Sequence, residues 1–382
     1  MHPDIPFHHI PSPCYILDEK LLYRNLKLIS KVSQEAGVKI ILALKGFSMY
    51  GAFDIVKKYL PGTTASSLNE AKLAYHEYGG EVHAYCVAYL AHEMDEMMQY
   101  CGHITFNSIS QWQKYKDIIQ KHSKNITCGI RINPQYSEVD TDLYNPSIPG
   151  SRLGMTYTHL GNTLPQGIEG LHFHNLCEGD SYALERTLQA VETKFGHLIA
   201  QCKWFNMGGG HLMTHEKYNT DHLIHILTSF KARYPNLQEV ILEPGSAIAW
   251  QTGYLLATVQ DVIENGGKIT AVIDASVSAH MPDCIEMPYT AKIYGAAAVD
   301  EGKYVYKIGG LTCLAGDHMG PYSFDKPLEA GSQIVFDDMM HYTMVKTTTF
   351  NGVNLPNIGI WRESGKFELL KSFGYEEYKA RL

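Results

Sequence analysis

The stretch KIILALKGFSMYG, residues 39–51, runs from an apolar segment directly into a lysine, Lys45. Five of the six residues from Ile40 to Lys45 are apolar, a pattern typical of a strand buried on both faces. A buried ammonium group is costly unless it reaches solvent, finds a partner or loses its proton. The stretch therefore predicts an interior strand that ends at a lysine in an unusual environment.

Seven further runs of this strand type follow along the chain, with helix-like stretches between them. Amphipathic helices are expected at 18–37, 67–79 and 181–201. Strands that alternate with helices pair in parallel, and eight such units over about 230 residues have the size of a (β/α)8 barrel. We therefore expect an α/β fold with a TIM-like barrel over residues 19–248; a doubly wound open sheet is the alternative. The strand candidates are 39–45, 62–67, 82–88, 103–107, 126–133, 167–174, 203–210 and 239–245.

After residue 248, strand-like segments with turn signals replace this alternation. The pattern predicts an antiparallel β domain of the sandwich or barrel-like type, formed by residues 249–382 together with 1–18, because 12–18 also reads as an extended segment. The expected strands are 254–263, 268–276, 289–299, 303–310, 331–338 and 342–350.

The composition excludes several classes of partner. The net charge is −8 and no run of basic residues occurs, so neither nucleic acid nor an anionic membrane is expected to bind. No apolar run approaches 18 residues and the N-terminus does not resemble a signal peptide. The eight cysteines form no CxxC pair, which fits a reducing compartment. We expect a cytoplasmic protein.

Polar residues follow most of the predicted barrel strands at their carboxyl ends. In a (β/α)8 barrel these ends meet at one rim, where active sites lie. The residues at this rim would be Lys45, Ser67, Arg131, Asn133, His174, Gly208, Gly209, Gly210 and Glu243.

Two of these strand ends carry motifs with more than one interpretation. GLHFH (170–174) places His172 and His174 on one side of a strand. The two residues could be metal ligands, His174 could stack on a flat ring, or both could be core histidines. NMGGGHL (206–212) ends a strand in three glycines, which form either a backbone cradle for phosphate or only a tight turn.

Two further motifs supply an acid and a carboxylate. ILEPG (241–245) contains Glu243, which could hold a protonated ring nitrogen or cap a turn. IGGLTCLAGDHMG (308–320) contains Cys313 and Asp317; a thiol can donate a proton near neutral pH, although buried cysteines are usually structural. A lysine, a phosphate cradle, a histidine, a carboxylate and an acid are together the parts of a pyridoxal phosphate (PLP) site.

The motifs ALKGF, TASSLNEA, GLHFH, GGG, EPG, TCLAGD and HYTMVKTTTFNG cover nearly the whole chain. In this order the set resembles the PLP-dependent decarboxylases of the alanine racemase fold (fold type III), which include ornithine and diaminopimelate decarboxylases. Within that group, ILALKGF, HFHNLCE, AHMPD and TCLAGD are most similar to carboxynorspermidine decarboxylases. The resemblance implies a PLP-dependent enzyme and a homodimer.

The resemblance also implies a role for each matching residue. Lys45 would bond PLP covalently, His174 would stack on its ring and Glu243 would pair with the ring nitrogen. Cys313 would be the catalytic acid and, with Asp317, would reach the active site of the partner subunit. Many members carry an arginine after EPG where this chain has Ser246, so the phosphate ligand there stays open. Further cofactor contacts are expected from Ser67, Arg131, Gly208, Gly209, Gly210, Gly245 and Tyr342.

The charges of the C-terminal part address the substrate. No arginine occurs between Tyr234 and Trp361, which disfavours diaminopimelate, because a distal carboxylate is best held by arginine. A small substrate with a cationic polyamine tail is expected, bound by Asp274, His280, Asp283 and Asp317.

We therefore expect decarboxylation of carboxynorspermidine, carboxyspermidine or both to norspermidine and spermidine, with PLP as cofactor and no metal. The open alternatives are a decarboxylase of another basic amino acid such as diaminopimelate or ornithine, a PLP racemase and a non-catalytic PLP-binding protein. An alternative of a different class is a metal-dependent barrel hydrolase that uses His172 and His174.

Overall fold

The structure, a computed structural model, describes residues 4–297, 299 and 301–382. Residues 1–3, 298 and 300, which belong to the predicted β domain (1–18 and 249–382), lie outside the described residues, and 298 also falls in the predicted strand 289–299. Contacts divide the chain into two compact units: Asn25–Ile248 forms one, and the segment up to Arg24 together with Ala249–Leu382 forms the other. Among the described residues, no helix is long and apolar enough to cross a membrane.

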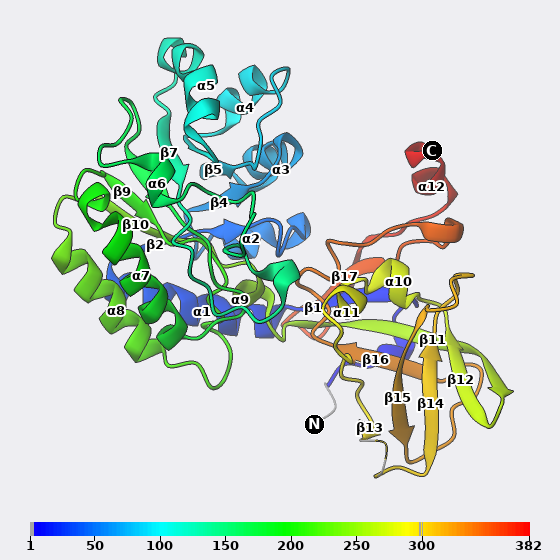
Figure 1. The fold of residues 1–382 in the computed structure, drawn as a ribbon. Helices are drawn as coiled ribbons and strands as arrows, with labels where there is room; N and C mark the ends of the chain where they lie inside the picture. Colours follow the sequence, from blue (N-terminus) through cyan, green and yellow to red (C-terminus); the bar gives the residue numbers. More distant parts are fainter. Residues whose placement is uncertain (1–3, 298, 300) are drawn as a thin grey trace. The chain divides into compact units, whose positions relative to one another are not determined.

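The unit of Asn25–Ile248 contains one sheet of parallel strands with helices outside it (Figure 1). The sheet order is β2-β10-β9-β8-β7-β6-β5-β4-β3, so from β3 to β10 neighbours in the chain are neighbours in the sheet. The strands are β2 (Lys39–Ile40), β3 (Leu42–Ala43), β4 (Gly62–Ala65), β5 (Glu81–Tyr85), β6 (His103–Phe106), β7 (Thr127–Arg131), β8 (Gly170–His172), β9 (Trp204–Asn206) and β10 (Glu239–Leu242).

The barrel closes through the first strand, which is split into β2 and β3 at Ile41. β2 pairs with β10, the last strand of the unit, whereas β3 pairs with β4. The N–H of Ile41 donates to Leu242 O at 3.0 Å and the N–H of Leu44 donates to Thr64 O at 3.2 Å, so one short segment joins both edges. The predicted α/β barrel is confirmed, and the open-sheet alternative is wrong.

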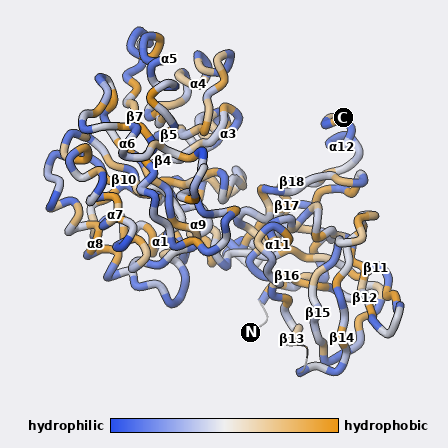
Figure 2. Tube along the Cα trace, in the orientation of Figure 1, coloured by the Kyte–Doolittle hydropathy of each residue, from blue (hydrophilic) through white to orange (hydrophobic). Residues whose placement is uncertain are grey.

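Amphipathic helices cover the strands. In α7 the side chains of Leu184, Leu188 and Val191 are buried, at the spacing of one helix face. This helix begins where Asp180 accepts the N–H of Ala183 at 2.8 Å, a side-chain cap. Figure 2 shows hydrophobic and hydrophilic residues alternating along α7 and α8. The helices are α1 (Glu19–Ala36), α2 (Phe53–Val56), α3 (Leu68–Leu73), α4 (Met94–Tyr100), α5 (Ile109–Lys121), α6 (Tyr157–Leu160), α7 (Ser181–Ile199), α8 (Thr220–Arg233) and α9 (Ser246–Ala249).

An indole ring fills part of the barrel. Trp204 is buried with Ile41 and Ile241. A Cβ built on Gly129 would lie 2.2 Å from the Trp204 ring, and one on Gly170 would lie 2.0 Å from it. Only glycine fits at these two positions of β7 and β8, and the interior is packed rather than open.

The other unit contains a nine-stranded sheet in the order β13-β15-β14-β12-β11-β1-β17-β18, with β16 paired to β11. Pairing is antiparallel except for β1 with β17 and β12 with β14. The predicted antiparallel character is confirmed. The strands are β1 (Cys14–Asp18), β11 (Gly253–Asn265), β12 (Lys268–Ile273), β13 (Ala296–Ala297), β14 (Tyr304–Gly309), β15 (His318–Phe324), β16 (Gln333–Asp337), β17 (Asn357–Trp361) and β18 (Phe367–Lys371).

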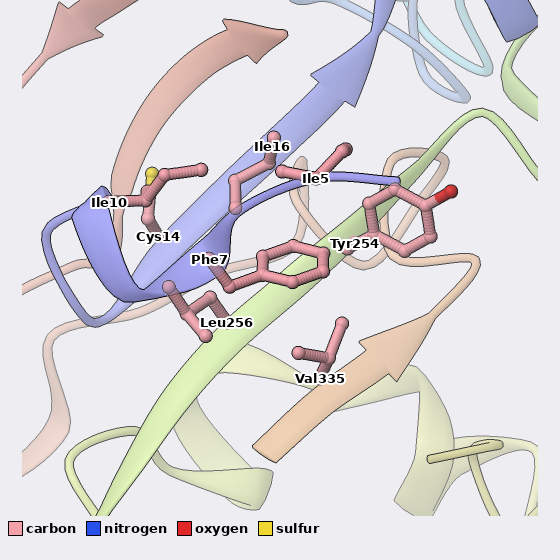
Figure 3. Close-up of a cluster of buried hydrophobic side chains, with 8 residues drawn as sticks. All are labelled: Ile5, Phe7, Ile10, Cys14, Ile16, Tyr254, Leu256 and Val335. Carbon is pink, nitrogen blue, oxygen red and sulfur yellow. The ribbon is translucent and has the colours of Figure 1, made fainter. Parts of the chain in front are cut away.

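Apolar side chains from distant parts of the sequence form a core in this unit. Figure 3 shows Phe7, Ile16, Leu256 and Val335 in one buried cluster with Tyr254. The rings of Phe7 and Tyr254 meet edge to face, with centroids 5.7 Å apart. Short helices complete the unit: α10 (Val277–His280), α11 (Asp283–Glu286) and α12 (Tyr375–Arg381).

Two predicted strands of this unit need correction. The segment 342–350 forms turns, because Tyr342 has a φ of 49° and its carbonyl accepts the N–H groups of Val345 and Lys346 at 3.0 and 2.9 Å. Among the described residues of 289–299, only Ala296–Ala297 forms a strand. The β-branched and aromatic composition favoured strands, but local turns override that preference here.

Candidate active site

Lys45 lies two residues beyond β3, at the carboxyl end of the first barrel strand. Its Nζ is 3.4 Å from Nε2 of His174. Burial lowers the pKa of Lys45, the charge of Arg131 lowers it further, and Glu243 opposes the shift. A lysine with a lowered pKa has more of the neutral amine, which is the form that attacks a carbonyl carbon.

His174 follows β8 and is held by the backbone of the glycine segment. Its Nδ1 accepts the N–H of Gly209 at 2.7 Å, and its Nε2 faces Lys45. Burial lowers the pKa of His174 well below its ordinary value, and the charges of Lys45 and Arg131 add to the effect. The ring is therefore neutral with its proton on Nε2, and it is suited to stacking on a flat ring.

The three glycines after β9 allow backbone segments to approach closely. A Cβ on Gly208 or Gly209 would lie 2.3 Å from a backbone carbonyl oxygen, and one on Gly210 would lie 2.0 Å from one. Gly208 and Gly210 also have φ values of 68° and 83°. Any side chain here would displace neighbouring strand ends.

The hydrogen bonds of these glycines reduce the number of backbone N–H groups that remain to bind a phosphate. The N–H of Gly208 donates to Asn206 Oδ1 at 2.8 Å, and the N–H of Gly209 is committed to His174. Within the described part of the chain, the N–H of Gly210 has no acceptor. The next helix begins only at Thr220, so the glycines do not open a helix. Gly210 is the glycine best suited to bind an anion.

Glu243 follows β10 and is 7% exposed. Its Oε1 accepts Nδ2 of Asn206 at 2.7 Å, and its Oε2 lies 3.6 Å from Nε2 of His172. Asn206 was not predicted from the sequence. The feature that could have identified it is that a polar residue ends the strand before the glycines. The geometry gives the carboxylate a fixed orientation.

Arg131 ends β7 and is buried. Its Nη2 donates to His174 O at 3.0 Å, and its Cζ lies 4.7 Å from the centroid of the Tyr85 ring. Tyr85 was also missed, although it is the last residue of β5. Ser67 is exposed at the start of α3, where its Oγ accepts the N–H of Glu70 at 3.2 Å. In this structure Ser67 is a helix cap.

Gly46 and Gly245 bring together the loops that follow the first and last strands. A Cβ on Gly46 would lie 2.7 Å from Gly245 Cα. Contact between these two backbones sets the spacing of Lys45, next to Gly46, and of Glu243, two residues before Gly245.

The ring nitrogens of His172 and His174 face Glu243 and Lys45, respectively. Among the described residues, the group of side chains close enough to hold a metal ion lies elsewhere, at the amino ends of β5 and β6, and consists of Glu81, His83 and His103. There Lys39 Nζ donates to both oxygens of Glu81, at 3.0 and 2.7 Å, so a side-chain cation already pairs with the carboxylate.

Cys313 lies between β14 and β15 on an exposed loop. Its N–H donates to Oδ1 of Asn351 at 2.8 Å, and Asn351 adopts a φ of 57°. Leu311 and Leu314 on the same loop are 45% and 48% exposed. The backbone of the loop is anchored, while its thiol and two apolar side chains are accessible.

Asp317 anchors the same loop from the other end and is buried. Its carboxylate accepts the N–H and hydroxyl of Thr312 at 3.0 and 2.6 Å, the N–H of Ser278 at 2.8 Å and the hydroxyl of Ser276 at 3.0 Å. Burial acts to raise the pKa of Asp317, but these hydrogen bonds outweigh it and the pKa is lowered. Both oxygens are used within the unit.

The other predicted substrate residues differ in how far they are engaged. His280 is fully buried, its Nδ1 accepts the N–H of Ser276 at 3.1 Å, and burial lowers the pKa of His280 to about 4. Asp274 accepts the N–H of Thr258 at 2.8 Å, and burial raises the pKa of Asp274. These contacts hold the two side chains within the sheet unit.

Asp283 keeps one acceptor atom without a partner. Its Oδ2 accepts the hydroxyls of Thr343 and Tyr289, at 2.7 and 2.8 Å, whereas its Oδ1 is buried and has no hydrogen-bond partner. A buried carboxylate oxygen without a donor is costly unless a ligand supplies one.

Comparison with known families gives one match across most of the chain. The family described as pyridoxal-dependent decarboxylase, C-terminal sheet domain, matches residues 14–340. A carboxyaminopropylagmatine decarboxylase of Synechocystis sp. is 50% identical over 98% of this chain and 96% of its own length. A carboxynorspermidine/carboxyspermidine decarboxylase of Campylobacter jejuni is 42% identical over 98% of this chain and 99% of its own.

Solved structures agree with these relatives. The crystal structure of carboxynorspermidine decarboxylase complexed with norspermidine, from Campylobacter jejuni, has a TM-score of 0.90 at 41% identity and covers 98% of this chain and 100% of that one. Diaminopimelate decarboxylase from Helicobacter pylori has a TM-score of 0.78 at 17% identity and covers 98% of this chain and 97% of that one, a likeness of fold.

Proposed function

The chain belongs to the pyridoxal-dependent decarboxylases, and from that premise we propose that its substrate is a carboxylated polyamine precursor with a cationic tail. Carboxyaminopropylagmatine is the first candidate, because the relative named for it is 50% identical. Carboxynorspermidine and carboxyspermidine are the second, since the relative named for them is 42% identical and a solved relative holds norspermidine.

The residues at the carboxyl ends of the barrel strands fit PLP. They provide an amine with a lowered pKa in Lys45, a neutral imidazole in His174 and a buried carboxylate in Glu243. The N–H of Gly210 is a donor suited to the phosphate. When bound, PLP supplies the sink for the electron pair left on Cα as CO2 departs. Residues 19–248 are the proposed PLP-binding domain.

Each of these side chains has a proposed part in the reaction. Lys45 would hold the cofactor covalently through its side-chain nitrogen. Glu243 would keep a proton on the ring nitrogen, and His174 would fix the plane of the ring. Cys313 donates the proton that Cα takes up after CO2 has left.

We propose that the cationic tail of the substrate binds at Asp283. The observation that supports this proposal is that Oδ1 of Asp283 is buried and has no hydrogen-bond partner. An ammonium or guanidinium group would supply the missing donor and pair with its charge. Asp274, His280 and Asp317 would then shape the surroundings through the hydrogen bonds they already make.

Release of CO2 from the candidate substrates, measured on the purified PLP-loaded protein, tests the proposal. We expect turnover of carboxyaminopropylagmatine or of carboxynorspermidine and carboxyspermidine. We expect kcat/KM for diaminopimelate and ornithine to be lower by about 10- to 100-fold, the worth of one hydrogen bond to a charged group. Equal or better turnover of diaminopimelate would contradict the polyamine assignment.

A further inference from the structure

Glu243 has two neighbours that nothing in the proposed mechanism uses, His172 and Asn206. Asn206 is fixed at both ends of its amide: Nδ2 donates to Glu243 Oε1 at 2.7 Å and Oδ1 accepts the N–H of Gly208 at 2.8 Å. The amide cannot rotate without breaking both hydrogen bonds. One oxygen of the carboxylate is therefore held in place by the strand that precedes the glycines.

His172 faces the second oxygen of the same carboxylate. Its side chain is 2% exposed, and neither ring nitrogen has a hydrogen-bond partner. Nε2 lies 3.6 Å from Glu243 Oε2, and the Tyr85 ring packs edge to face against the imidazole with centroids 5.4 Å apart. A buried imidazole without a partner is costly, so its position requires an explanation.

The surroundings favour the neutral form of this ring. Burial lowers the pKa of His172 well below its ordinary value, and the charges of Arg131 and Lys45 add to the shift. A neutral imidazole still has one N–H, and the carboxylate oxygen Oε2 of Glu243 is an acceptor that lies 3.6 Å from Nε2. Closing 3.6 Å to hydrogen-bond distance needs only a small movement of the carboxylate, of the kind expected when a site takes up its ligand.

We propose that His172 is a positioning residue, which donates its Nε2–H to Glu243 Oε2 in the PLP-loaded protein and, with Asn206, fixes the carboxylate against the ring nitrogen of the cofactor. This inference rests on the proposed role of Glu243. It also gives the two histidines of GLHFH different roles. His174 contacts Lys45 and would stack on the ring of the cofactor, whereas His172 would orient the carboxylate of Glu243.

The test uses His172→Leu, which keeps the volume and removes the donor, and His172→Gln, which restores an N–H. We expect His172→Leu to lower kcat by about 10- to 100-fold at nearly unchanged KM, as loss of a hydrogen bond to a charged group would. The visible absorption band of bound PLP should shift, because the protonation of its ring nitrogen changes. His172→Gln should recover part of both.

The control is His92→Leu, the same substitution in the same unit at a side chain that is 79% exposed, which should leave the band and kcat unchanged. A His172→Leu protein with the normal band and kcat would overturn the inference, and so would a His172→Gln protein no better than His172→Leu. If Glu243→Gln also leaves the band unchanged, the proposed role of Glu243 fails as well, so the two failures are distinguishable. Should His172→Leu not fold, His172→Gln against His92→Gln decides the question by the same two readouts.

Discussion

Lys45 shows how an apolar strand can end at a lysine. The residue lies beside His174, and burial, followed by the charge of Arg131, disfavours its ammonium form and lowers the pKa of Lys45. This environment destabilises the ammonium cation and so favours the neutral amine. The neutral amine is the form that covalent attachment of PLP requires. The environment that looks unfavourable for folding is favourable for the proposed chemistry.

Capture of PLP by the apoprotein should depend on pH accordingly. Because the folded pKa of Lys45 lies below the ordinary 10.5, the rate should rise with pH through a midpoint below that value. Borohydride trapping between about pH 6 and pH 11.5, followed by peptide mass mapping, measures the label on Lys45. Arg131→Gln removes a charge that lowers this pKa, so its midpoint should move upward. A label on another lysine, or a midpoint at 10.5, would refute this account.

Asp317 should contribute to stability rather than to substrate contact alone. In Asp317→Asn an NH2 group replaces one acceptor oxygen opposite the donors of Thr312 and Ser276, at a cost of about 1–3 kcal/mol of unfolding free energy. Since the folded pKa is lowered, the wild-type advantage is present above the unfolded value of 3.8 and is lost as pH falls through the folded pKa.

Urea unfolding at several pH values measures this difference. Asp117→Asn, an exposed aspartate of α5, is the matched control and should change stability by less than about 0.5 kcal/mol. An Asp317→Asn protein as stable as the control at neutral pH would show that the network is not a stabilising one.

At the scale of elements, sequence periodicity predicted the barrel well and the sheet unit less well. All eight predicted barrel strands overlap observed ones, although most observed strands end earlier, so Lys45, His174 and Glu243 lie in loops. Parallel strands buried on both faces leave a clear apolar signature. The turns at 342–350 were missed because a left-handed residue such as Tyr342 has no signature in composition.

The contacts within the site were predictable in kind but not in detail. The rim position of Lys45 and Glu243 follows from topology, since carboxyl ends of barrel strands converge. Which side chains then meet depends on barrel closure and on side-chain direction, which a single sequence does not contain. Asn206 and Tyr85 were missed for that reason, and for His172 the sequence left several interpretations open.

The contact between the loops that follow the first and last barrel strands, at Gly46 and Gly245, can be tested by a substitution that adds one methyl group. Gly46→Ala would place a Cβ 2.7 Å from Gly245 Cα, a backbone atom that cannot move aside cheaply. Gly102→Ala is the control, because a Cβ there meets nothing within 4 Å. We expect Gly46→Ala to lower the free energy of unfolding by about 1–3 kcal/mol, measured by thermal unfolding. We also expect it to bind PLP more weakly, measured by PLP titration. Equal behaviour of the two variants would mean that the loops are not held by this contact.

At the scale of the whole molecule, the loop of Cys313 indicates why one chain is not expected to act alone. Its backbone is anchored by Asn351 and Asp317, yet Leu311, Leu314 and the thiol are exposed. Exposed apolar side chains on an anchored loop are typical of an interface. We propose a homodimer in which Cys313 serves the active site of the partner subunit.

Coexpression of Lys45→Ala and Cys313→Ala chains with two different tags tests this arrangement. A doubly purified heterodimer contains one site with Lys45 from one chain and Cys313 from the other, and one site that lacks both. It should therefore recover about half of the wild-type kcat per dimer, whereas each variant alone is nearly inactive. Pairing Lys45→Ala with the double variant Lys45→Ala/Cys313→Ala is the control and should stay inactive. A doubly tagged dimer without activity would mean that each chain completes its own site, and failure of the tags to copurify would mean that the chains do not dimerise; either result would overturn the shared-site proposal.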